Sequence, residues 1–273
     1  MASLGQIIFY TMIILIVIFA AFIILILALA FSGAGSRVQS TNTSPIGNLS
    51  DDVLLSCYLN KNNHQAVNDI SVTWKKANLA GLVYKYQNGA PDLTDQNSQF
   101  KGRTLPFLDK LMTGNASLLL KGVRNSDRGE YTCSISYSEG TGEVNIYLRT
   151  AAFSAPTFTL LQGILATHAS WWFPKPNVTW SDYDGKVLLG NNILTESSTG
   201  IFSVVSTLQP VNNSGTYTCS IENNLLISIS QATITGSNVS WSTYFTYSTA
   251  SSLLASTYLI TTTSIALCIY YLI

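Results

Sequence analysis

Charged and chemically reactive side chains are scarce in this chain. Of its 273 residues only 10% are Asp, Glu, Lys or Arg, and the 14 basic and 14 acidic residues cancel to a net charge of zero. Because no run of basic residues is present, the sequence excludes binding to nucleic acid through its phosphates. The two histidines, His64 and His168, stand without a nucleophile elbow, phosphate loop or His-Glu-x-x-His motif, so we predict no enzyme.

Cysteine is rare as well, with four residues in all. They are too scattered to form a zinc site by themselves, and we expect no metal, no cofactor and no small-molecule substrate. Cys268 lies in an apolar segment, where a cysteine usually serves as a small hydrophobic residue. The remaining three accompany tryptophan and tyrosine in a pattern that predicts the fold.

The order Cys57, Trp74 and then the run Asp127–Cys133 is typical of a variable-type immunoglobulin sandwich. In such a domain two cysteines on facing sheets form a disulfide across the core, a tryptophan packs beside it, and a tyrosine, here Tyr131, closes the corner before the second cysteine. We therefore predict a disulfide between Cys57 and Cys133, which for a loop of this length contributes roughly 4 to 5 kcal/mol. Such a bond requires an oxidising compartment.

An ion pair is also predicted inside this domain. Arg103 lies where variable-type domains often hold an arginine that pairs with the aspartate of the tyrosine corner, here Asp127. A solvated surface arginine is the alternative. If the pair were only partly buried, it would contribute about 1 kcal/mol or less.

A second set of signals, in the second half of the chain, resembles a constant-type domain. Trp180 takes the place of the core indole, Tyr217 that of the corner tyrosine and Cys219 that of the cysteine after it. No cysteine stands at the expected distance before Trp180, where Thr167 is found instead, so Cys219 has no partner in its own domain. We favour a buried thiol for Cys219, and a thiol that bridges to another chain is the alternative.

Hydrophobic segments occupy both ends of the chain. Residues 1–32 contain an apolar run and a small-x-small cleavage motif at Ala28-Leu29-Ala30, which favours a removed signal peptide over a retained anchor. Residues 253–273 are uncharged, and a transmembrane segment and the signal for a glycolipid anchor fit them equally well. No charged residue follows Glu222, so we expect no cytoplasmic tail with a signalling motif.

Between these ends the turn-rich sequence predicts an all-β chain of two immunoglobulin-like sandwiches in tandem, variable-type then constant-type. We place the variable-type domain at residues 37–149, the constant-type domain at 154–236 and a polar stalk at 237–252. Each domain then has about 100 residues, the usual size of this fold.

One sheet of the first domain is predicted to turn a polar face to solvent, because its hydrophobic residues alternate with polar ones. Polar, lightly charged faces suit weak and transient protein contacts. Solvated strand positions with no partner are the alternative for any single residue. We expect a protein partner on the outward side of the C, C′, F and G strands, at Thr73, Lys75, Tyr86, Ser134, Ser136, Ser138, Glu139 and Thr141.

Six Asn-x-Ser/Thr sequons are consistent with secretion and mark expected glycosylation sites, because a glycan must lie where it is solvated. Their number alone is close to what chance would produce. Pro45 follows the first sequon and weakens it. The sites are Asn42, Asn48, Asn115, Asn177, Asn212 and Asn238.

Several short segments are more specific than the cysteine and tryptophan pattern. They are Met1–Ile7, Phe100–Thr104, Gly114–Leu118, Trp172–Pro176 and Ile221–Asn223. With these segments the chain resembles, over nearly its whole length, the B7 family of butyrophilin-related ligands on antigen-presenting cells. Its second domain departs from that family in lacking the first cysteine, and no charged stretch precedes the terminal segment.

The resemblance implies a cell-surface glycoprotein of adaptive immunity that binds a receptor on T cells and lowers their activation, proliferation and cytokine production. We accordingly expect a plasma-membrane protein with extracellular domains, held by a single span or a glycolipid anchor. Homophilic or heterophilic cell adhesion is the alternative function.

Overall fold

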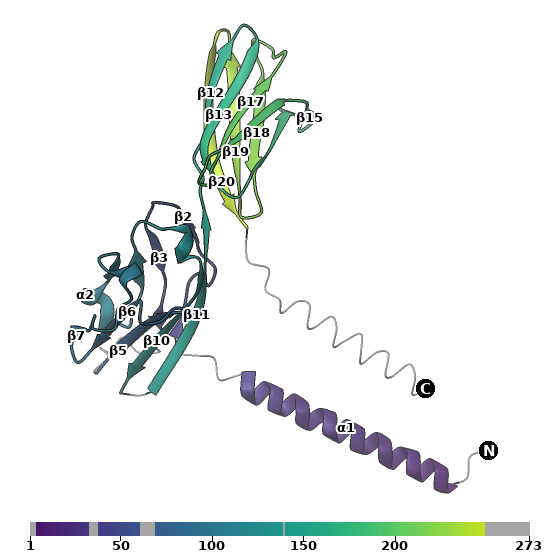
Figure 1. Cartoon of the computed structure of the whole chain (residues 1–273). Coiled ribbons are helices and arrows are strands. Elements are labelled where there is room, and N and C mark those ends of the chain that lie inside the picture. The colour runs from purple at the N-terminus through teal and green to yellow at the C-terminus, as the bar shows by residue number, and fades with distance from the viewer. Residues whose placement is uncertain (1–3, 33–37, 61–68, 139, 249–273) are drawn as a thin grey trace.

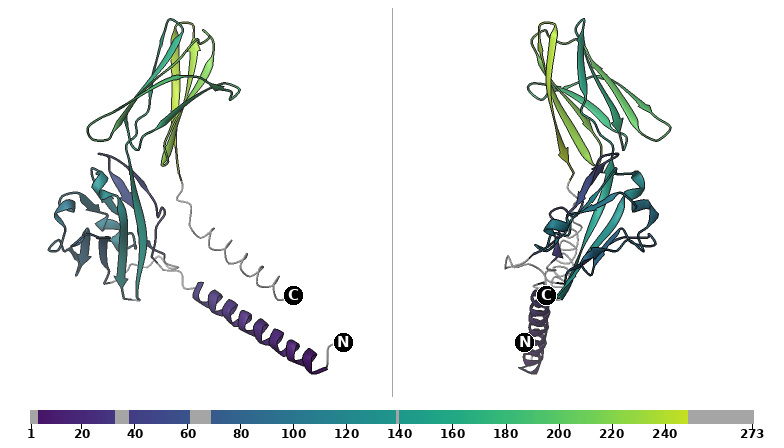
Figure 2. Two further views of the ribbon diagram at one scale, coloured as in Figure 1. Left: turned by 45° about the vertical axis from the view of Figure 1, so that its right-hand side comes forward. Right: turned by 90° about the vertical axis from the view of Figure 1, so that its left-hand side faces the viewer.

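The structure is a computed structural model, and it describes residues 4–32, 38–60, 69–138 and 140–248. These residues form a long helix and two β-sandwiches that are stacked end to end (Figure 1; Figure 2). The predicted architecture of two sandwiches in tandem is confirmed. The terminal segment 253–273 and Glu139 lie outside the described residues.

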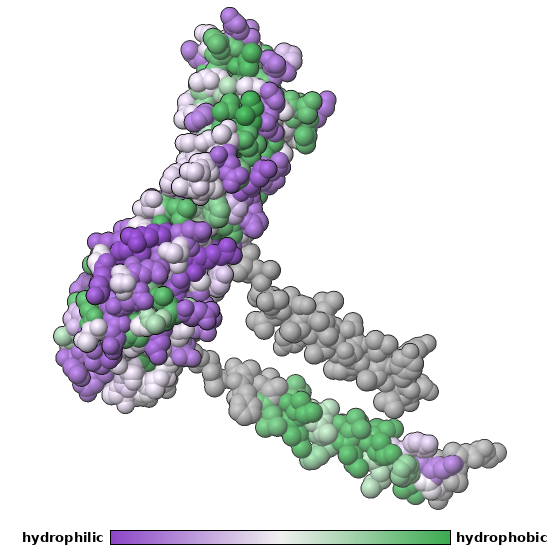
Figure 3. All heavy atoms as spheres, viewed as in Figure 1, coloured by the Kyte–Doolittle hydropathy of each residue, from purple (hydrophilic) through white to green (hydrophobic). Residues whose placement is uncertain are grey.

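Helix α1, Leu4–Ser32, is apolar along its length. Its segment Ile8–Leu27 has a mean hydropathy of 3.1 and no buried residue, and Figure 3 shows it covered with hydrophobic side chains. The hydroxyl of Thr11 donates a hydrogen bond to the carbonyl of Ile8, so its polarity is satisfied within the helix. The helix is long and apolar enough to cross a membrane, and a signal sequence has the same properties.

The first domain folds into two facing sheets. Its strands are β1 (Val38–Gln39), β2 (Ile46–Asn48), β3 (Val53–Leu55), β4 (Tyr58–Leu59), β5 (Ser71–Lys76), β6 (Tyr84–Gln87), β7 (Ala90–Pro91), β8 (Thr104–Pro106), β9 (Leu118–Leu120), β10 (Gly129–Tyr137) and β11 (Gly140–Ala151), with short helices η1 (Ser98–Phe100), α2 (Leu108–Leu111) and η2 (Asn125–Asp127). The large sheet has the order β2-β11-β10-β5-β6-β7 and the small sheet the order β3-β9-β8, while β1 pairs with β4.

The core of this domain lies between the two sheets and follows from the alternation of the strands. In β10, Tyr131, Cys133 and Ile135 have no exposed surface, while the residues between them are partly or fully exposed. Trp74 is equally buried and lies opposite Cys133 in the register of β5 and β10. One side of the large sheet therefore packs on the core, and its other side faces solvent.

The second domain repeats this plan with different strands. They are β12 (Thr157–Leu161), β13 (Ile164–Trp172), β14 (Asn177–Asp182), β15 (Val187–Leu188), β16 (Asn191–Glu196), β17 (Phe202–Leu208), β18 (Thr216–Glu222), β19 (Leu226–Thr235) and β20 (Asn238–Tyr247). One sheet has the order β12-β13-β17-β16 and the other the order β15-β14-β18-β19-β20.

The prediction of a stalk at residues 237–252 is wrong, because strand β20 occupies most of this segment. Residues Thr235 and Asn238 pair across a two-residue turn whose first residue, Gly236, has a φ of +63°, so the chain folds back along β19. Val239 and Phe245 then pack on the core of the second domain. The segment is rich in Ser and Thr, which suggested a stalk, but Val239, Trp241, Phe245 and Tyr247 lie on the same side of the strand, as a half-buried strand requires.

The two sandwiches meet at a short junction. Strand β11 runs out of the first domain toward the second (Figure 1), and its last residue is followed by an antiparallel bridge between Ala152 and Phe173. The side chain of Asn48 accepts a hydrogen bond from the main-chain N–H of Phe153 and donates a longer one to its carbonyl. The ring of Phe153 lies 5.2 Å from that of Phe245 and 5.9 Å from that of Tyr247, both in β20.

Candidate interaction face

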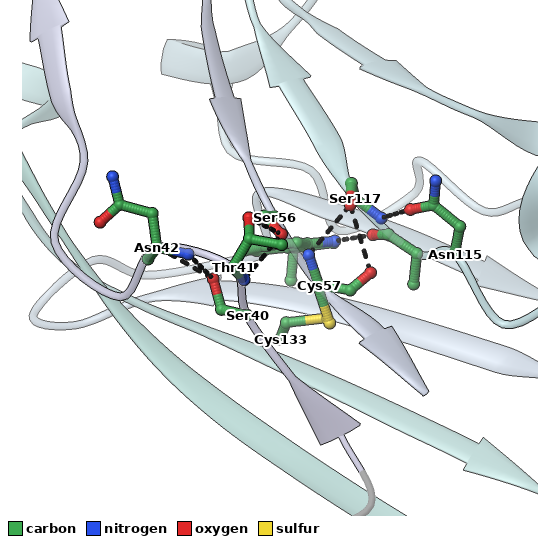
Figure 4. Close-up of a disulfide and its surroundings, with 10 residues drawn as sticks. Ser40, Thr41, Asn42, Ser56, Cys57, Asn115, Ser117 and Cys133 are labelled. Atoms are coloured by element: carbon green, nitrogen blue, oxygen red, sulfur yellow. Dashed lines mark hydrogen bonds between the residues drawn. A yellow bond between two sulfur atoms is a disulfide. The ribbon is translucent and has the colours of Figure 1, made fainter. Parts of the chain in front are cut away.

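The disulfide predicted between Cys57 and Cys133 is present and joins the two sheets of the first domain, with the Cα atoms 6.5 Å apart. Hydrogen bonds extend from it on the small-sheet side (Figure 4). The main chain of Cys57 donates to the hydroxyl of Ser117, and the neighbouring Ser56 hydroxyl accepts from both the N–H and the hydroxyl of Thr41. The edge segment at Thr41 is thereby tied to the covalent centre of the domain.

The ion pair predicted between Arg103 and Asp127 also forms. Both groups are buried, with Arg103 9% exposed and Asp127 fully enclosed, and each guanidinium Nη atom faces one carboxylate oxygen. Burial alone would raise the pKa of Asp127, but hydrogen bonds from Arg103, Gln99 and the main chain of Arg124 bring it below its ordinary value. Tyr131 donates its hydroxyl to the carbonyl of Asp127 at 2.7 Å, which closes the tyrosine corner.

The large sheet presents the polar face that the sequence predicted. In register, Ser134 of β10 lies between Thr73 of β5 and Glu143 of β11, and Ser136 lies between Ser71 and Thr141. Of the other expected residues, Lys75 and Ser138 are exposed. We call the outward residues of these strands the large-sheet face: Thr73, Lys75, Lys85, Gln87, Thr132, Ser134, Ser136, Thr141, Glu143 and Asn145.

Tyr86 was expected on this face, and that expectation is wrong. It pairs with Val72 in the register of β5 and β6, and so it turns inward, where it packs on the core of the first domain. Its neighbours Lys85 and Gln87 take the outward positions, and both contact Asp92, at 3.3 and 2.7 Å respectively. Hydrogen bonds from Thr94 and Lys85 lower the pKa of Asp92, so the group stays anionic beside the lysine.

Sequence reasoning missed several members of the large-sheet face. Lys85 was missed because the strand holding it was read one residue out of phase, and a one-residue shift moves every side chain to the opposite side. Glu143 and Asn145 were left out although β11 alternates as regularly as β10 does. The hydroxyl of Thr132 donates to the amide oxygen of Asn145 at 2.9 Å, so two strands of the face are cross-linked at the surface.

The second domain has the expected core residues, and Cys219 forms no disulfide within it, as the sequence predicted. Trp180 is 1% exposed and donates its indole N–H to the hydroxyl of Ser206 at 2.7 Å, and Tyr217 accepts a hydrogen bond from the main chain of Asn212. Cys219 is a free cysteine with no exposed surface, and burial raises the pKa of its thiol to about 12. A neutral, enclosed thiol agrees with the buried thiol that we favoured and opposes the alternative, a bridge to another chain.

The six sequons differ in their surroundings. Asn42, Asn177, Asn212 and Asn238 are exposed, whereas Asn48 and Asn115 are half-buried. The side-chain nitrogen of Asn48 donates to Asp51 at 2.8 Å and reaches the carbonyl of Phe153, and a glycan would have to replace both hydrogen bonds. Glycosylation at the exposed four therefore stays a prediction, and at Asn48 the geometry opposes it.

Comparison with known proteins identifies the two domain types. The model of the immunoglobulin V-set domain matches residues 40–148, and that of the butyrophilin subfamily 3 member A2-like Ig-C domain matches residues 164–229. The chain is 38% identical over 251 residues to V-set domain-containing T-cell activation inhibitor 1 of Rattus norvegicus, which covers 88% of this chain and 87% of that protein. The chain belongs to the B7/butyrophilin family. The protein of the same name in Homo sapiens is 36% identical over the same length.

Among solved structures, the human B7-H4 IgV-like domain is 36% identical, covers 42% of this chain and 96% of its own, and has a TM-score of 0.38. Membership of the B7/butyrophilin family makes this chain an immunoglobulin-superfamily co-signalling ligand with extracellular domains. The immunoglobulin superfamily domains it contains belong to a family without enzymatic activity.

Proposed function

We propose that this chain binds a receptor on T cells and negatively regulates their activation, proliferation and cytokine production. The observation that carries the proposal is the 38% identity, over 88% of the chain, to a relative whose name states that it inhibits T-cell activation. The length of the match matters, because it includes both domains and the junction between them.

The large-sheet face is the surface through which we propose that the receptor binds. It has hydroxyl groups at Thr73, Ser134 and Ser136, with charged groups on the neighbouring positions Lys75 and Glu143. Such a face exchanges hydrogen bonds with water for hydrogen bonds with a partner and gains little hydrophobic free energy. It therefore suits weak, fast contacts between two cell surfaces.

For the tether we propose the terminal segment 253–273, either as a single span or as the signal for a glycolipid anchor. A phospholipase specific for glycolipid anchors separates the two, because it releases only the anchored form from the cell. The plasma membrane is then the site at which the ligand acts.

The proposal is tested by displaying the full chain on cells beside an activating stimulus and counting T-cell divisions. We expect fewer divisions with the native chain, and restored division with Ser136→Arg, which puts a long charged side chain on the large-sheet face near the turn between β10 and β11. Leu54→Arg is the matched control, since Leu54 is 46% exposed on the opposite sheet. Unchanged division together with clustering of the displaying cells would instead favour adhesion.

A further inference from the structure

Arg149 at the domain junction has no anionic partner among the described residues. Its Nη1 atom donates to the hydroxyl of Ser248 at 2.8 Å, and its Nη2 atom donates to the carbonyls of Ser248 and Ser44 at 2.7 and 2.9 Å. All of these acceptors are neutral, and no carboxylate of the described residues forms an ion pair with it. Its Nε atom is buried and has no hydrogen-bond partner in the part of the chain that the structure describes.

A half-buried guanidinium with a free donor is an energetically incomplete arrangement. Removing a charge from water without pairing it is unfavourable, and burial lowers the pKa of Arg149 from its ordinary value. The arrangement is stabilised when an anion beside the guanidinium supplies the missing charge and accepts from the hydrogen that Nη1 has left.

Space for such an anion lies beside the guanidinium. Arg149 lines a cavity of about 460 Å³, within the range of roughly 300 to 1,000 Å³ that small-molecule sites occupy. One wall comes from the edge of the first domain and the other from the end of β20 in the second. Besides Arg149, the described residues that line it include no charged one: Thr41, Asn42, Thr43, Ser44, Pro45, Ile46, Tyr247 and Ser248.

The first-domain wall is held in place before any ligand arrives. Thr41 is tied to Ser56 beside the disulfide (Figure 4), and the amide oxygen of Asn42 accepts from the main chain of Ser44 at 3.0 Å. The carbonyl of Thr43 accepts from the main chain of Tyr147 in β11. A pre-formed polar wall loses little entropy when it binds a ligand.

We propose that this junction cavity binds an acidic sugar of the sialic-acid type at the end of a glycan chain. A single arginine matches one carboxylate, because its positive charge attracts the acid and its Nη1 atom keeps one hydrogen to donate. The hydroxyls of Thr43 and Tyr247 match the hydroxyls of a sugar. A phosphate group or a sulfated polysaccharide would call for further cations, and the described residues of the lining provide none. The proposal does not depend on the proposed receptor or on the sign of its signal.

The test uses cells that display the full chain, treated with sialidase to remove their own terminal acids. They are incubated with a fluorescent polymer carrying sialyllactose or, as the neutral counterpart, lactose. We expect the sialylated polymer to bind at least about tenfold better, because only it carries the carboxylate. Equal binding of the two polymers, or no binding of either, would overturn the proposal.

Variants assign the binding to the cavity. Arg149→Lys keeps the charge but removes the remaining Nη1 donor and the hydrogen bonds that hold Ser44 and Ser248, so binding should fall about tenfold. Thr43→Val keeps the shape and the sequon at Asn42 and removes one hydroxyl, which should lower binding several-fold even if the arginine variant fails to reach the surface. Arg128→Lys, at an exposed arginine of the same domain, should bind as the native chain does. Binding that survives both cavity variants would place the sugar elsewhere.

The acid could come from the chain's own glycans or from an opposing cell. Asn42 is a wall residue and carries a predicted glycan, so a self-derived acid would block the cavity until sialidase acts or until Asn42→Gln removes the glycan. An acid from an opposing cell would leave the cavity open, with equal binding before and after sialidase. Either result supports the cavity as an acidic-sugar site and identifies the source.

Discussion

Asp127 is the residue on which the corner of the first domain depends. It receives both Nη atoms of Arg103, the amide of Gln99 and the main chain of Arg124, and its own carbonyl accepts from Tyr131. Because these bonds lower the pKa of Asp127 in the folded chain, its contribution to stability is fully present above its ordinary pKa of 3.8. The contribution is lost as the pH falls through the lowered value.

We therefore expect the free energy of unfolding to fall with pH below about 4, and Asp127→Asn to remove part of that fall. At neutral pH the same variant should lose about 3 to 5 kcal/mol, since it leaves the buried Arg103 without its counter-ion. Urea unfolding of the purified full chain at several pH values measures both effects. Asp184→Asn, at an exposed aspartate, is the control. If the native chain and Asp127→Asn showed the same pH dependence of unfolding, Asp127 would not be the group responsible for it.

Thr167 and Cys219 occupy in the second domain the positions that the two bridged cysteines occupy in the first. Both are buried, and Cys219 lies opposite Trp180 in the strand register as Cys133 lies opposite Trp74. Thr167→Cys should therefore form a disulfide with Cys219. A closed loop of about 50 residues should add about 4 kcal/mol, less any strain.

The effect is measured as a rise in the melting temperature that a reductant abolishes, together with a peptide map of the linked cysteines. Thr167→Val fills the same site without a thiol and should show no response to reductant. Free thiols at both positions in the cysteine variant would mean that the two sheets hold these residues too far apart.

At the scale of elements, strands whose side chains alternate strictly could be predicted from the sequence. The inward set of β10 and the positions of Trp74 and Trp180 follow from cysteine and tryptophan spacing, because the disulfide and the indole both need the space between two sheets. The ion pair between Arg103 and Asp127 was predicted because Arg103 lies where variable-type domains often hold an arginine that pairs with the corner aspartate. Local pattern and long-range packing agree at these positions.

Prediction failed where the pattern was ambiguous. Tyr86 was assigned to the wrong side of β6 because a strand of four residues carries too few residues to fix its phase. Strand β20 was assigned to a stalk because hydroxyl residues fill its outward positions, although Val239 and Phe245 mark an inward side. The cavity at Arg149 could not be foreseen, since it exists only when β20 folds back and brings Ser248 to the first domain.

In the whole molecule, β20 adds side-chain contacts to the junction beyond the chain that connects the two domains. Arg149 of the first domain holds Ser248, the last described residue, and Phe153 between the domains packs on two aromatic rings of β20. The described part of the chain therefore ends beside the first domain and not at the far end of the second domain. Contacts from three separate segments, at Arg149, at Phe153 and in β20, hold the two sandwiches in their orientation. We therefore expect these contacts to form and break together.

Phe153→Ala tests that coupling. The ring is half-buried, so its loss should lower the free energy of opening the junction by about 1 to 2 kcal/mol, with at least part of this from the aromatic pairs. Amide exchange of the full chain, followed by mass spectrometry, should then become about tenfold faster at Ser248 and the end of β20, and stay unchanged in β10. Leu161→Ala, at a residue 71% exposed on β12, removes a side chain away from the junction and should alter neither. Equal exchange at Ser248 in both variants would mean that β20 is held by its pairing with β19 alone and that the aromatic contacts do not fix the junction.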